Sequence, residues 1–157
     1  MNKFLLIVST LFLSISAANA AVVIDPTAGW SGKFYWYDGV GQIDGIDGAG
    51  SDNEWSITAG TDSVMTLATA FDGYVPGDEF ALVLDGTQIN WTSSYIDSSG
   101  YFHGVYDDLF LSAGSHTLSL NVVALAPGHS SGGAFADFSG IVPQVSEPMT
   151  LALLGFG

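Results

Sequence analysis

The chain has 157 residues, with two Lys or Arg, sixteen Asp or Glu, and no Cys. Nucleic acids and anionic membrane surfaces are bound through basic side chains, so this composition argues against both as partners. The lack of Cys excludes disulfides, thiolate catalysis, cysteine zinc sites and iron–sulfur clusters.

Residues 1–20 have the features of a secretory signal peptide. Lys3 supplies the charged start, "FLLIVSTLFL" the apolar middle, and Ala18-Asn19-Ala20 a small-x-small cleavage site. A membrane anchor is the alternative, which the shortness of the apolar stretch disfavours. We expect cleavage after Ala20. The remaining chain then has Lys33 as its one Lys or Arg and a formal charge of −15.

Short segments with a period of two predict half-buried strands along residues 21–140. The clearest alternation is in EFALVLD (79–85), QINWT (88–92) and HTLSLNVVA (116–124). KFYWYD (33–38) and SVMTLATAF (63–71) are also rich in strand-forming residues. No sustained helical period appears after residue 20.

The turn signals favour antiparallel pairing. Asp85-Gly86 predicts a hairpin between two alternating segments, and Ala113-Gly114 predicts a second reversal of the chain. Strands of this length and spacing predict an all-β fold, an antiparallel β-sandwich that is jelly-roll-like in outline. A closed β-barrel is the alternative.

One long connection, Asp38–Glu54, contains five glycines and five carboxylates and is expected to lack regular structure. Asp44, Asp47, Asp52 and Glu54 offer the hard oxygen ligands that calcium prefers, which makes calcium a candidate cofactor. The spacing does not match an EF-hand loop, so a solvated flexible loop is the alternative. A second candidate ion site combines Asp107, Asp108 and Asp137.

Aromatic residues beside loops are candidates for stacking on sugar rings, with Asp and Asn binding the hydroxyl groups. Trp30, Trp55 and Tyr95 flank predicted loops and are the best candidates. Packing in the core is the alternative for any of these side chains, because aromatic residues are also common in strands.

A hydrolase is a further hypothesis. "GHSSG" (128–132) matches the G-x-S-x-G pattern with Ser130 as nucleophile, but that motif requires a turn from a strand into a helix. Pro127 precedes the match and no helical period follows it, so a Gly/Ser-rich turn explains it better. His103, His116 and His129 have no metal-ligand spacing. We therefore expect a protein that is not an enzyme.

The chain ends in "VSEPMTLALLGFG" (145–157), which resembles the PEP-CTERM sorting signal of Gram-negative bacteria. The resemblance rests on Glu147, Pro148, Thr150 and Leu151, followed by an apolar Leu/Ala/Gly stretch. Ser146 and Met149 depart from the usual pattern. The remaining apolar helix and the basic cluster of such signals do not occur before Gly157, so we expect the natural chain to continue.

The resemblance implies that residues 141–157 are a linker and a partial sorting signal cleaved by an exosortase. The tail of the full-length protein would hold it in the inner membrane only transiently. The protein is then expected at the cell surface, in the cell envelope or in the extracellular polymer matrix. We predict a structural or adhesive role there, with extracellular polysaccharide as a partner. A secreted carbohydrate-binding module is the alternative, and a small secreted hydrolase ranks below it.

Overall fold

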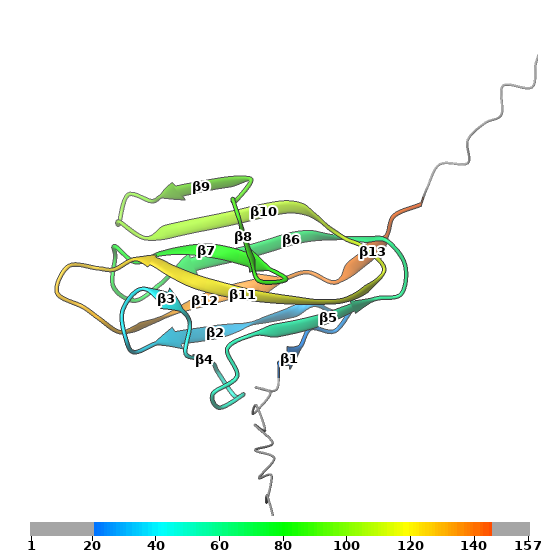
Figure 1. Cartoon of the computed structure of the whole chain (residues 1–157). Helices are drawn as coiled ribbons and strands as arrows, with labels where there is room; N and C mark the ends of the chain where they lie inside the picture. The colour runs from blue at the N-terminus through cyan, green and yellow to red at the C-terminus, as the bar shows by residue number, and fades with distance from the viewer. Residues whose placement is uncertain (1–20, 146–157) are drawn as a thin grey trace, which may run out of the picture.

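The computed structural model describes residues 21–145, which fold into two β-sheets packed face to face (Figure 1). The six-stranded sheet has the order β1-β5-β11-β7-β8, with β3 beside β11. Its strands are β1 (Val22–Val23), β3 (Gly41–Gln42), β5 (Trp55–Ala59), β7 (Glu79–Leu84), β8 (Thr87–Ile89) and β11 (Gly114–Ala124).

The seven-stranded sheet has the order β4-β2-β12-β6-β10-β9, with β13 beside β6. Its strands are β2 (Trp30–Trp36), β4 (Gly45–Ile46), β6 (Ser63–Asp72), β9 (Ser93–Ile96), β10 (Phe102–Leu111), β12 (Gly132–Phe138) and β13 (Ile141–Pro143). The described strand pairs are antiparallel apart from β1 with β5. The predicted antiparallel sandwich is confirmed, and the sheets do not close into a barrel.

The core between the sheets combines large rings with very small residues. Phe34, Trp36 and Trp55 are at most 1% exposed. In the same sheet as Phe34 and Trp36, the inner faces of β6 and β12 carry alanines that are fully buried: Ala68, Ala70, Ala134 and Ala136. Small side chains on these strands leave room for the rings of the neighbouring strands, which allows close packing without voids.

The two predicted reversals have different outcomes. Asp85 and Gly86 have φ values of 49° and 74° and join β7 to β8, which is the predicted hairpin. Ala113-Gly114 also reverses the chain, but it connects β10 in one sheet to β11 in the other. Turn chemistry does not tell whether a returning strand pairs with its predecessor or crosses to the facing sheet.

Three other expectations need correction. The 38–54 connection contains β3 and β4, and Ile43 and Ile46 are buried, so it packs into the sandwich instead of forming a loop without regular structure. The sandwich also extends beyond residue 140, since β13 pairs with β6 through Pro143. Trp91 lies outside β8, where its indole donates a hydrogen bond to the Phe80 carbonyl at 2.8 Å.

Candidate functional site

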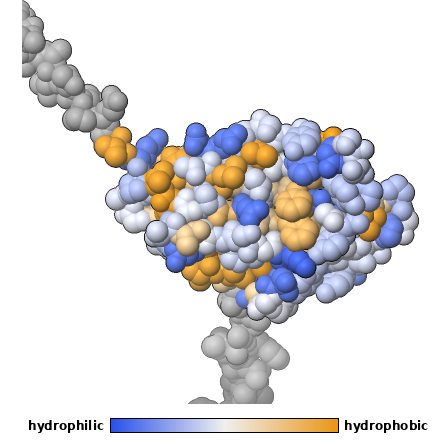
Figure 2. Space-filling view, turned by 180° about the vertical axis from the view of Figure 1, so that it is seen from behind, coloured by the Kyte–Doolittle hydropathy of each residue, from blue (hydrophilic) through white to orange (hydrophobic). Residues whose placement is uncertain are grey.

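The outer face of the seven-stranded sheet carries a row of aromatic rings that crosses four strands. Strand register places His103 of β10 opposite both Tyr95 of β9 and Phe71 of β6. Phe71 in turn lies opposite Phe135 of β12, whose other neighbour is Lys33 of β2. Seen from behind, this face has hydrophobic side chains in separate groups among hydrophilic ones (Figure 2).

Neighbouring rings in this row are nearly parallel. The ring centroids of Tyr95 and His103 are 4.8 Å apart, those of His103 and Phe71 5.9 Å, and those of Phe71 and Phe135 4.8 Å. The interplanar angles are 6°, 7° and 11°. Parallel rings at about the spacing of adjacent strands cover each other's faces. The rings with a neighbour on both sides, such as His103 and Phe71, therefore stabilise the sheet and do not offer a free flat surface to a sugar.

The end of the row near β2 opens into a pocket of about 380 Å³. Its lining consists of Lys33, Phe34, Tyr35, Asp47, Tyr74 and Gly133. Tyr74 stacks on Phe135 at 5.3 Å and is 50% exposed, and the Lys33 ammonium lies 5.7 Å from the centre of the Tyr74 ring. The pocket thus combines an aromatic wall with one cation, one carboxylate and two phenol groups.

The 38–54 segment builds the opposite wall of this pocket. The Tyr35 hydroxyl donates a hydrogen bond to the Gly50 carbonyl at 2.7 Å, and the Asp47 amide donates to the Lys33 carbonyl at 2.9 Å. Gly45 is required under the Tyr35 ring, because a Cβ atom there would collide with it. The side chain of Tyr74, and to a lesser extent the charge of Asp47, raises the pKa of Lys33, so the ammonium remains charged at neutral pH.

The three residues predicted to stack on sugar rings differ in how far the structure buries them. Trp55 is fully buried and packs against Trp30 and Phe138 at centroid distances of 5.1 and 5.0 Å, so its assignment to sugar binding was wrong. Trp30 also faces the core and is half-buried. Tyr95 is 55% exposed at the sheet edge and remains available. Alternation along a strand does not show which of the strand's two faces the facing sheet will cover.

The four acids proposed to bind calcium do not converge. The Asp44 carboxylate accepts a hydrogen bond from the Tyr37 amide at 2.6 Å, Glu54 accepts one from the Gln42 side chain at 3.2 Å, and Asp47 lines the pocket. Within residues 21–145 no three Asp, Glu or His side chains are grouped so as to hold a metal. This result includes Asp52, and it also includes the alternative site of Asp107, Asp108 and Asp137.

Ser130 lies in an exposed turn that leads into β12, a strand, and not into the helix that its motif requires. His103 and His116 are bound to Asp97 and Asp85, respectively. Ala18, Ala20, Glu147, Pro148, Thr150 and Leu151 lie outside the described residues.

Sequence reasoning singled out Tyr95 and Asp47 but missed most of the residues that form the row and the pocket, above all Phe71, Tyr74 and Phe135. β12 itself was not predicted, although Ala134, Ala136 and Phe138 alternate with outward residues. That alternation was the available signal, but the Gly/Ser-rich residues 128–133 before it indicated a turn and not the start of a strand.

Comparisons with protein-family models, with curated proteins and with solved structures find no significant match to this chain. Among residues 21–145 there is no helix long and apolar enough to cross a membrane. The function is therefore inferred from the residues of the site and from the tail.

Proposed function

We propose that this chain is a secreted, non-enzymatic protein of the bacterial cell surface or extracellular matrix, with an adhesive role through polysaccharide binding. The observation that carries the proposal is the pocket beside Tyr74. Sugar sites in proteins combine an aromatic surface for the apolar face of the ring with a few polar groups for the hydroxyls. Tyr74, Lys33 and Asp47 supply this combination in a pocket of suitable size.

The lining of the pocket favours binding over hydrolysis. A glycosidase generally needs two carboxyl groups flanking the bond that it cleaves. Asp47 is the one carboxylate among the residues lining this pocket, and Lys33 also lines it. The pocket residues therefore support a binding role for the sandwich.

The two ends of the sequence support the location. Residues 1–20 resemble a secretory signal, and Glu147-Pro148 resembles the site that an exosortase recognises. A proline disfavours helix at the preceding residue, which keeps a cleavage site extended and accessible. A protein released by this route would act among the polysaccharides of the cell exterior.

Affinity electrophoresis in gels containing the extracellular polysaccharide of the host tests the binding role. The protein should be retarded, and Tyr74→Ala should weaken binding about tenfold, which corresponds to about 1.4 kcal/mol. Phe110→Ala is the matched control, because Phe110 is 49% exposed and does not line the pocket. Equal retardation of Tyr74→Ala and wild type would contradict the proposal, as would a wild type that no polysaccharide retards.

A further inference from the structure

Two buried carboxylates lie at the end of the sandwich where the chain passes from one sheet to the other. Asp72 is the last residue of β6, and Asp78 directly precedes β7. Asp72 is 1% exposed and Asp78 is 3% exposed. Asp72 continues the inward-facing side of β6 beyond Ala68 and Ala70, so its side chain points between the sheets.

The hydrogen bonds inside the protein leave one oxygen of this pair without a partner. The Asp78 Oδ1 atom accepts a hydrogen bond from the Ala126 amide at 2.8 Å. The Asp72 Oδ1 atom has only a long contact of 3.4 Å from the Tyr74 amide, and Asp72 Oδ2 is buried without any partner. A buried acceptor without a partner is unfavourable, and a buried carboxylate even more so.

No side chain within residues 21–145 supplies a compensating positive charge. The ion pairs of this region are His103 with Asp97 and His116 with Asp85, and neither includes Asp72 or Asp78. Lys33 is on the outer face of the sheet, over the rings of Tyr74 and Phe135. Burial raises the pKa of Asp72, the main-chain amide of Tyr74 lowers it, the nearby charge of Asp78 raises it, and the amides of Asp78 and Gly73 lower it, so that the net direction is upward. A proton or a cation at the unpartnered Asp72 oxygen would relieve the burial of this carboxylate.

We propose that Asp72 and Asp78 bind a calcium ion, with water as a further ligand. The donors are carboxylate oxygen atoms, which suit calcium and not the softer transition metals. With two carboxylates the affinity should lie in the range of extracellular calcium sites, with a Kd of about 10⁻⁴ to 10⁻³ M. The ion would bind the start of β7 to the end of β6 and so hold the two sheets together.

Thermal unfolding of the purified secreted protein, in EDTA and in 10 mM CaCl₂, tests this site. An ion that binds only the folded state stabilises it, so calcium should raise the Tm by about 5–10 °C. Asp72→Asn should abolish that rise. Asp47→Asn is the matched control, because Asp47 lies in the acid-rich segment and should leave the rise unchanged.

Terbium luminescence provides a second measurement that needs no variant. Trp36 is at the same end of the sandwich, since it pairs with Gly132 while Asp72 pairs with Ala134. Excitation of tryptophan should therefore produce terbium emission, and calcium should reduce it.

Three results would overturn the proposal: no calcium effect on the wild-type Tm, the same effect in Asp72→Asn, or its loss in Asp47→Asn. If Asp72→Asn does not fold, absence of calcium-sensitive terbium emission from the wild type also overturns it. A wild type that does not respond to calcium, and that loses stability in EDTA as the pH rises above the usual Asp pKa of about 4, would assign a proton to Asp72 instead.

Discussion

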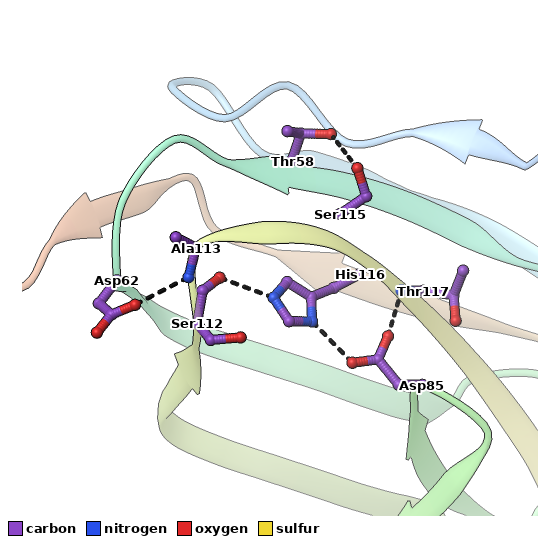
Figure 3. A network of polar contacts seen from close by, with 8 residues as sticks. All are labelled: Thr58, Asp62, Asp85, Ser112, Ala113, Ser115, His116 and Thr117. Atoms are coloured by element: carbon purple, nitrogen blue, oxygen red, sulfur yellow. Dashed lines mark hydrogen bonds and ion pairs between the residues drawn. The ribbon is translucent and has the colours of Figure 1, made fainter.

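His116 lies where both of its ring nitrogens face an acceptor. Nδ1 is 2.7 Å from the Asp85 carboxylate, and Nε2 is 2.8 Å from the Ser112 carbonyl (Figure 3). A neutral imidazole can donate only one hydrogen bond, so the doubly protonated ring fits this environment best. The Asp85 carboxylate, followed by the Ser112 carbonyl, raises the pKa of His116 above its usual value near 6.5.

We predict a pH-dependent contribution of His116 to stability. Because the folded-state pKa is raised, this stabilisation is complete below pH 6.5 and is lost as the pH rises through the folded-state pKa. Asp85 is 48% exposed, so water screens the pair and the effect should be about 1 kcal/mol. Urea unfolding of wild type and His116→Gln should differ by this amount at pH 5.5 and by less at pH 9. His129→Gln, in an exposed turn, should show no such trend; a pH-independent effect of His116→Gln would contradict the explanation.

At the scale of elements, β6 is the central strand of its sheet. It pairs with β10, β12 and β13, and its two faces have different roles. Inward, Ala68 and Ala70 make room for the rings of the core. Outward, Phe71 stacks between His103 and Phe135, so it joins three strands through side chains as well as through the backbone.

Replacing the middle ring of this row should therefore weaken the sheet. Each aromatic pair contributes about 0.5–1.5 kcal/mol beyond the burial of its area, and Phe71 has two such partners. We expect Phe71→Ala to reduce the free energy of unfolding by about 1–3 kcal/mol more than Phe110→Ala does. Phe110 is on the neighbouring strand and forms no aromatic pair with the described residues. Equal losses in chemical denaturation would show that the stacked row does not stabilise the sheet.

At the scale of the whole molecule, the last strand of the sandwich ends a few residues before the proposed sorting signal. Pro143 ends β13 opposite Ser63, and the Gln144 amide donates a hydrogen bond to the Asp62 carbonyl at 2.8 Å. Glu147 follows Pro143 by four residues, a span of about 13 Å when fully extended. A membrane protease acting at Glu147-Pro148 would therefore work close to the folded sandwich.

The proposed sorting can be tested in the native host. Replacing Glu147 and Pro148 by Ala should prevent processing, so that an unprocessed form accumulates in the membrane fraction on immunoblots. Pro143→Ala changes a proline outside the motif and should be processed normally. If the double variant is released as efficiently as the wild type, the motif is not the recognition site.

Local patterns predicted much of the fold. Period-two alternation located β7 and β11, and Asp85-Gly86 located a hairpin that needs positive φ at both positions. The scarcity of basic residues is enough to argue against nucleic acid as a partner. The strand and hairpin predictions succeed because they depend on neighbours in the sequence, where side-chain period and turn chemistry act directly.

Only the tertiary structure decided which strands are neighbours and which face of each strand is covered. It buried Trp55, left the Phe71 row on the outer face and brought Asp72 near Asp78. It also assembled the pocket from residues as distant in sequence as Lys33 and Gly133. Alternation along a strand separates two faces but contains no information about the partner strand or the facing sheet. By itself the sequence determined a charge, a set of strands and their turns; packing of the sheets determined the sites.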